Sequence, residues 1–276
     1  MNPIVEAIAP DARVRILLPS EISALKQFIQ PPKHLPTPSP DVVDLGSRLN
    51  LSNTPFVKME AINELTDMQT ALLSNDRRDL RNFATTLNAP GGLERLGQII
   101  AVDLFNGSTD RFYPHNTGLV GEYRLRCLVN IGNVFKVYTN GRFEVGALDF
   151  ADPNSYYRDI DVPLEKAEGS AGANDPWPGR ILADGMRRYS FAKDVVHDLE
   201  KVLNIHKSAL SFRTKLNRNA PERIVYGMIE GVRLIKNKLI SQYSLSKKWT
   251  DGVNDRYLII RDICPPFLDS KHFKYK

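Results

Sequence analysis

Cysteine is scarce in this sequence. Cys127 and Cys264 are the only two among 276 residues, and they lie far apart. Such a pair has neither the spacing of a zinc site nor the density of a disulfide-stapled secreted domain, so both classes are excluded. We expect two buried thiols without a chemical role.

Long apolar runs are also absent. No stretch of about 18 apolar residues occurs, which argues against a membrane span. The N-terminal residues MNPIVEAIAPDARVR lack a basic start followed by a long apolar run, so no cleaved signal peptide is expected. The sequence therefore predicts a soluble protein. Secretion by a system that reads an uncleaved N-terminal segment is compatible with this pattern.

Two common hydrolase motifs are missing as well. The five histidines form no HExxH pair and no GxSxG elbow occurs, so neither a zinc hydrolase nor a serine hydrolase is expected. The 37 basic and 32 acidic residues give a net charge of +5, which is compatible with an anionic partner such as a nucleotide. The basic residues between 218 and 248 fit a solvated helix face, and no nucleic-acid partner is expected.

The sequence does contain enough apolar material for a sizeable core, since 42% of its residues are hydrophobic. In the N-terminal part, strands are expected over 13–18 and 54–62. Between them we expect a helix over 19–30 and an extended connector over 31–40, where five prolines exclude regular structure.

The rest of the chain is expected to be mainly helical. The spacing of apolar residues predicts a helix over 65–88 through Leu72, Leu73, Leu80, Phe83 and Leu87. Further helices are expected over 93–105, 191–203 and 221–240, and Gly107 suits the end of the first of these. Small and turn-forming residues over 165–179 predict a mobile loop. This order of elements predicts an α+β fold.

Polar residues stand at the ends of these apolar elements. Asp110 follows the helix over 93–105, and an Asn140-Gly141 turn predicts a hairpin that Asn133 opens and Asp149 closes. The amide and the carboxylate at the two ends of the hairpin should therefore lie close together. They form the incomplete ligand set that Mg²⁺ takes in enzymes acting on nucleoside triphosphates. Asp110 would then accept a hydroxyl proton or orient the acceptor.

At these residues the sequence resembles the protein-kinase-like superfamily. Residues 133–149 match the length and pattern of the kinase hairpin, with Asp149-Phe150-Ala151 in place of Asp-Phe-Gly. Ser108-Thr109-Asp110-Arg111 replaces His-Arg-Asp and is similar to the Asp-Arg loop of phosphatidylinositol kinases, HipA-like kinases and some bacterial secreted effectors. Asp110 and Asn133 are separated by 22 residues, where ordinary kinases have four.

The resemblance implies a bilobal fold. Residues 1–62 would form a minimal N-terminal lobe and hinge, and residues 63–276 a mainly helical catalytic lobe with a helical extension. FVKMEAINEL looks like the hinge strand of a kinase. The nucleotide is therefore expected against Met59, Glu60 and Ala61.

The phosphate-binding part of the small lobe departs from the kinase pattern. Arg15 with Glu21 takes the place of the lysine and glutamate that form the kinase ion pair. Whether Arg13, Arg15 or Lys26 replaces the lysine stays open. No glycine precedes Gly46, so the Gly-rich loop over the phosphates is missing.

Catalytic and metal-binding roles also follow from the resemblance. Asp110 and Arg111 are expected to be catalytic, and Asn133 and Asp149 to bind Mg²⁺. Arg111 is expected either to hold the loop by pairing with a carboxylate or to contact phosphate. The rival metal ligands are Asn116 and Asn130.

The expected function is ATP- and Mg²⁺-dependent phosphoryl transfer to Ser, Thr or Tyr of a protein. By analogy with atypical kinases, the acceptor would be a host protein and the chain a secreted bacterial effector. Three alternatives stay open: a lipid or small-molecule kinase, a nucleotidyl transferase that binds ATP in the inverted direction, and an inactive binding module.

Overall fold

The computed structural model describes residues 14–16, 57–59, 66–73, 77–108, 110–112, 130–139, 142–147, 155–171, 176–204, 214–246 and 249–263. This part of the chain is a mostly helical α+β structure, which confirms the expected fold class at that level. Strands β1 and β2 belong to one compact unit, and every other described element belongs to a second. A bilobal kinase arrangement stays a prediction.

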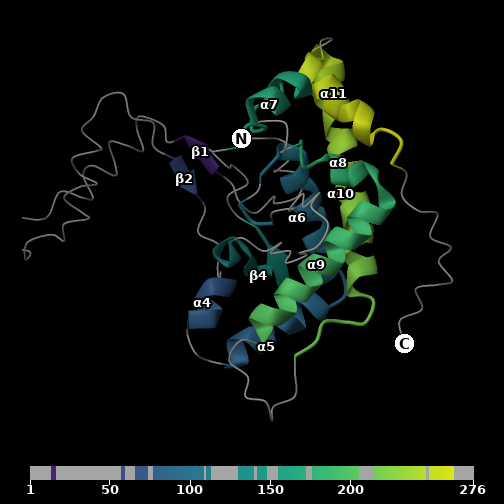
Figure 1. Cartoon of the computed structure of the whole chain (residues 1–276). Coiled ribbons are helices and arrows are strands. Elements are labelled where there is room, and N and C mark those ends of the chain that lie inside the picture. Colours follow the sequence, from purple (N-terminus) through teal and green to yellow (C-terminus); the bar gives the residue numbers. More distant parts are fainter. Residues whose placement is uncertain are drawn as a thin grey trace, which may run out of the picture. The chain divides into compact units, whose positions relative to one another are not determined.

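The first unit contains a two-stranded antiparallel sheet (Figure 1). Its strands are β1, Val14–Ile16, and β2, Val57–Met59, with Val14 opposite Met59. Both strands were predicted, and both are shorter than the predicted ranges. The helix expected over 19–30 and the connector over 31–40 lie outside the described residues.

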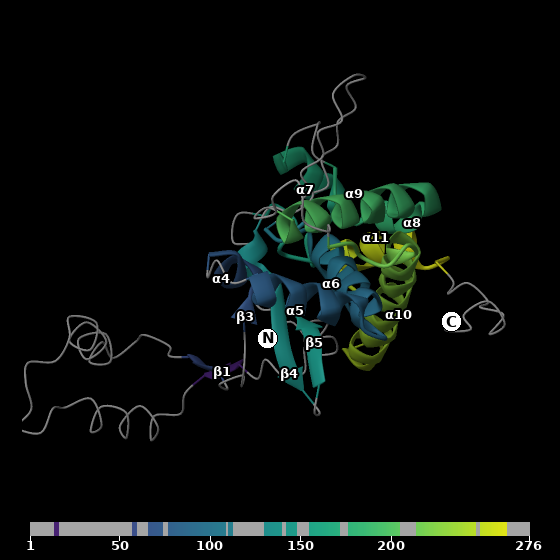
Figure 2. The same cartoon turned by 90° about the horizontal axis from the view of Figure 1, so that it is seen from below.

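The second unit contains a three-stranded antiparallel sheet in the order β3, Thr66–Asp67, then β4, Phe135–Thr139, then β5, Arg142–Gly146. Thr139 pairs with Arg142, so the predicted hairpin is confirmed with a two-residue connection. Figure 2 shows this hairpin beside helices α5, Arg77–Asn88, and α6, Gly92–Asn106.

The single helix predicted over 65–88 is wrong at its start. Residues 66–67 form β3 because they pair with β4, and helix α4, Met68–Leu73, begins immediately afterwards. The Asp67 carboxylate accepts a hydrogen bond from the Thr70 backbone N–H at 2.7 Å, as helix N-caps do. Leu73 is 74% exposed, so its predicted place in the core is also wrong, whereas Leu80, Phe83 and Leu87 are buried as expected.

Helix α6 is the most deeply buried element of this unit. The predicted apolar face is fully inside, with Leu93, Leu96, Ile99, Ile100 and Leu104 at most 1% exposed. The helix ends as predicted at Gly107, whose φ of 67° lies in the left-handed region that favours glycine. Asp103 is buried within the same helix.

The loop predicted over 165–179 is wrong in its first half, because α7 spans Leu164–Ala171. Glu, Lys and Ala in this segment favour helix, and Leu164 and Ala167 are buried beneath it. Trp177 is buried as well, and its indole N–H donates to the Phe105 carbonyl at 3.1 Å. The small residues therefore belong to a packed segment of the second unit.

Four more helices complete the described part of this unit. They are α8, Arg180–Ala183, α9, Gly185–Leu203, α10, Ala220–Ser246, and α11, Asp251–Ile260. Helix α9 begins earlier than predicted because the Asp184 carboxylate accepts the N–H groups of Met186 and Arg187. No helix in the described ranges is both long and apolar enough to cross a bilayer.

Helices α6 and α10 lie side by side and approach closely through glycines (Figure 1 and Figure 2). A Cβ added at Gly97 would lie 2.1 Å from the Ile224 carbonyl oxygen, and one at Gly227 would lie 2.0 Å from that of Glu94. Real Cβ atoms do not approach backbone this closely. The helix pair therefore requires the absence of side chains at these two positions.

We predict that Gly97→Ala lowers the free energy of unfolding by about 1–3 kcal/mol, because the two helices must separate to admit the methyl group. Gly169→Ala is the matched control, since Gly169 is exposed in α7 and its added Cβ meets no atom within 4 Å. That variant should be unchanged or more stable by up to about 1 kcal/mol. Urea unfolding measures both. Equal stability of the two variants would contradict the close approach.

Candidate active site

The loop after α6 turns back into the interior of the molecule. Gly107 ends the helix, and the backbone N–H of Ser108 donates to the Asp103 carbonyl at 2.8 Å. Asp110 is then half-buried, whereas Arg111 and Phe112 are at most 1% exposed. The loop thus carries a charged pair into the core.

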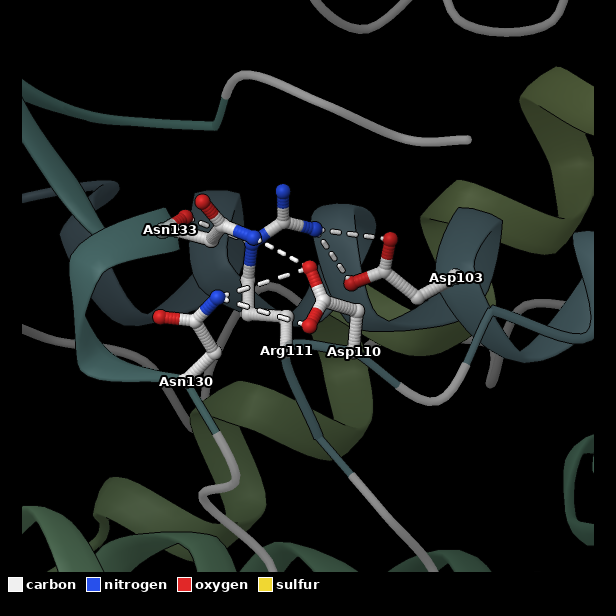
Figure 3. A network of polar contacts seen from close by, with 5 residues as sticks. All are labelled: Asp103, Asp110, Arg111, Asn130 and Asn133. Atoms are coloured by element: carbon white, nitrogen blue, oxygen red, sulfur yellow. Dashed lines mark hydrogen bonds and ion pairs between the residues drawn. The ribbon is translucent and has the colours of Figure 1, made fainter. Parts of the chain in front are cut away.

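Asp110 is hydrogen-bonded to two asparagines that come from the far side of a long insertion (Figure 3). Asn133 Nδ2 donates to Asp110 Oδ2 at 2.5 Å. Asn130 Nδ2 lies 3.4 and 3.5 Å from the two oxygens of the same carboxylate, which is a weaker contact. The structure therefore brings Asp110 and Asn133 together.

Asn133 does not open the first strand of the hairpin, as the sequence suggested. It ends a short 3-10 turn, η1, Ile131–Asn133, and β4 begins two residues later. The turn forms because the Asn130 side chain accepts the Gly132 N–H at 3.0 Å and caps it. Capping by Asn130 is a local signal that hydrophobic periodicity does not detect.

The two asparagines differ in what their oxygens face. Both donate from Nδ2 to Asp110, and the Oδ1 of Asn130 already accepts the Gly132 N–H. In Asn133, the bond from Nδ2 to Asp110 directs Oδ1 away from that carboxylate, because the amide oxygen and nitrogen occupy opposite branches. The structure therefore favours Asn133 over Asn130 as a donor of an amide oxygen to a cation.

Arg111 makes contacts that hold the loop in place. Its Nη1 donates to both Asp103 carboxylate oxygens, at 2.7 and 2.6 Å, and its Nε donates to the Asn133 carbonyl at 2.6 Å. Both charged side chains are almost fully buried. Pairing with a carboxylate is one of the two roles expected for Arg111. The contact with phosphate stays a prediction.

Asp103 was missed by the sequence analysis. It lies in the apolar run AVDLF, where helical periodicity draws attention to the apolar residues. A carboxylate in the middle of a buried helix needs a partner, since an unpaired charge in the core is costly. This argument could have identified Asp103 as a candidate partner of Arg111, which follows eight residues later.

Burial raises the pKa of Asp103 to about 6. The charge and the hydrogen bonds of Arg111 act in the opposite direction, and the nearby Asp110 carboxylate raises the pKa further. At neutral pH the Asp103 carboxylate is still mostly ionised. Asp103, Asp110 and Arg111 then leave one net negative charge at the site, which suits an added cation.

The remaining predicted site residues are not brought together by the described structure. Arg15 lies in β1 opposite Lys58, and Met59 ends β2, both in the first unit. The other positions lie outside the described residues: Arg13, Glu21, Lys26, Glu60, Ala61, Asn116 and Asp149. The hinge contacts and the meeting of Asn133 with Asp149 therefore stay predictions.

Asp103 should give the stability of the protein a pH dependence of defined sign. Its pKa rises from 3.8 to about 6 on folding, so between these values the folded state binds more protons than the unfolded chain. This contribution is fully present below pH 3.8 and is lost as the pH rises through about 6. The total loss should be about 3 kcal/mol.

Urea unfolding of the wild type and of Asp103→Asn, from about pH 4 to about pH 7, isolates this contribution. The stability of the variant relative to the wild type should increase as the pH rises. Parallel profiles for the two proteins would show that the Asp103 pKa does not change on folding.

Comparison with known proteins gives no further evidence on identity. No family model, no curated protein and no solved structure matches this chain. The resemblance to kinases therefore depends on the motifs of the sequence and on the geometry of Asp110, Arg111 and Asn133.

Proposed function

We propose that this chain is an ATP- and Mg²⁺-dependent phosphotransferase, and more specifically a protein kinase that acts on Ser, Thr or Tyr. The supporting observation is the hydrogen bond between Asp110 and the side chain of Asn133. These are the two residues that the resemblance assigns to the catalytic loop. The proposal is that they keep this relation although 22 residues separate them.

Asp110 is suited to accept a proton from an acceptor hydroxyl. Its carboxylate is half-buried and ionised groups of this kind accept up to about four hydrogen bonds. The contact with Asn133 uses one oxygen and fixes the orientation of the group. In the proposed reaction the hydroxyl oxygen forms the new bond to the γ-phosphorus, the bond to the ADP oxygen breaks, and the proton passes to Asp110.

Asn133 is the described residue best suited to bind the metal. Its amide oxygen faces away from Asp110, and Asp149, which follows three positions after the end of β5, would supply the carboxylate. Mg²⁺ prefers one or two such oxygen ligands together with water and phosphate oxygens. When bound, it would neutralise charge on the phosphates during transfer.

Nucleotide binding is assigned to the first unit in this proposal. Arg15 and Glu21 would contact the phosphates, and Met59, Glu60 and Ala61 would contact the adenine. The proposed acceptor is a host protein, reached after secretion of this chain by a bacterium. This last step depends on analogy with atypical effector kinases.

We predict that the wild type transfers the γ-phosphate of labelled ATP to protein in a cell lysate, and that Asp110→Asn lowers this rate about 100- to 10,000-fold. Asp149→Ala should abolish the Mg²⁺-dependent reaction to a similar extent. Glu165→Gln is the matched control, because it removes an exposed carboxylate from α7 and should leave transfer unchanged. Circular dichroism checks that each variant is folded.

The position of the label separates the alternatives. Transfer from α-labelled ATP, with a matching increase in target mass, would replace the kinase proposal with nucleotidyl transfer. Labelled lipid or small molecule without labelled protein would change the acceptor class. If calorimetry with ATP and Mg²⁺ shows no heat and no label is transferred, the chain is an inactive binding module.

A further inference from the structure

We propose that Asp103 is a positioning residue of this site, which acts through Arg111 on the backbone of Asn133. The inference rests on the proposed function, since it assigns a role to the side chain that Asn133 presents. It is supported by a continuous set of contacts from the interior of α6 to the turn before β4 (Figure 3).

The first step is the fixed position of Asp103. It lies in the part of α6 that is buried on all sides, and its carboxylate oxygens both accept from Arg111 Nη1. A side chain packed in a helix has few alternative positions, so the guanidinium is held against a rigid element. Charge-assisted hydrogen bonds are shorter and stronger than neutral ones, which strengthens this attachment.

The second step is the contact that Arg111 makes in another direction. Its Nε donates to the Asn133 carbonyl at 2.6 Å, while the Asn133 side chain donates to Asp110. Asp110 and Arg111 are neighbours in the chain. Two adjacent loop residues therefore hold Asn133 at its backbone and at its side chain, which restricts both the position and the rotation of its amide.

The third step is that stability alone gives weak grounds for this pair. Buried ion pairs are often no more stabilising than apolar residues of similar volume, because both charges must be removed from water. The raised pKa of Asp103 shows that this cost is felt here. An apolar pair could fill the same space, but it could not hold the Asn133 carbonyl.

The test is the double variant Asp103→Leu/Arg111→Met, which removes both charges and keeps the space filled. Urea unfolding should show stability close to that of the wild type. The side-chain NH₂ resonance of Asn133, measured by NMR without ATP and identified through its loss in Asn133→Ala, should shift because the amide is no longer held against Asp110. Phosphoryl transfer should fall about 10- to 100-fold, as for other residues that orient a metal ligand.

Arg111→Lys supplies a second, more conservative comparison. Lysine keeps the charge opposite Asp103 but lacks the planar fork that reaches two partners at once. It should therefore shift the Asn133 resonance and lower transfer in the same way. This variant tests the contact with Asn133 while a charged pair is retained.

The outcomes separate this inference from the proposed function. A double variant that keeps both the wild-type Asn133 resonance and the wild-type transfer rate would overturn the positioning role. If the wild type transfers no phosphate, the proposed function fails. The resonance of Asn133 still supports or overturns the positioning role in that case, because it is measured without ATP.

Discussion

The buried guanidinium of Arg111 joins the parts of the molecule on which the candidate site depends. It contacts Asp103 inside α6 and the carbonyl of Asn133 before β4. An arginine without partners in the core would cost several kcal/mol, so Asp103 is the condition under which the loop can turn inward. The adjacent Asp110 is brought to Asn133 as a consequence. Without the pair, nothing in the described contacts would hold Asn133 by its backbone to this loop.

The position of Asp103 depends in turn on how α6 is held. Gly97 and Gly227 allow α10 to approach α6 at backbone distance, and the Trp177 indole donates to the Phe105 carbonyl. At the end of the helix, Gly107 lies against Tyr157, and the Ser155 hydroxyl donates to the Gly107 carbonyl at 2.6 Å. Segments that are distant in the sequence therefore fix both the middle and the end of α6. The geometry of the loop is a result of core packing rather than of the loop sequence alone.

Local signals explain most of what the sequence could predict. Helix α6 with its terminal glycine and the β4–β5 hairpin each follow from residues within a few positions of one another, and both were predicted. Strand β3 forms because it pairs with β4, about 70 residues further along, so its own sequence reads as the start of a helix. The pairing of Asp103 with Arg111 was missed because periodicity ranks apolar residues and ignores a single carboxylate. Asp110 and Asn133 were paired through the resemblance to kinases, since spacing alone could not place them together.

The insertion between Asp110 and Asn133 gives the Arg111 contact its physical importance. Lengthening a connection from the four residues of ordinary kinases to 22 raises the entropy cost of bringing its ends together by about 1.5 kcal/mol. A hydrogen bond from a charged donor contributes about 1.5–3 kcal/mol, so a single contact from Arg111 to the Asn133 carbonyl is large enough to offset that cost. In a short catalytic loop the chain itself keeps the aspartate and the asparagine together. Here a buried side chain does so, and the length of the insertion can change without moving the two groups that the proposed reaction requires.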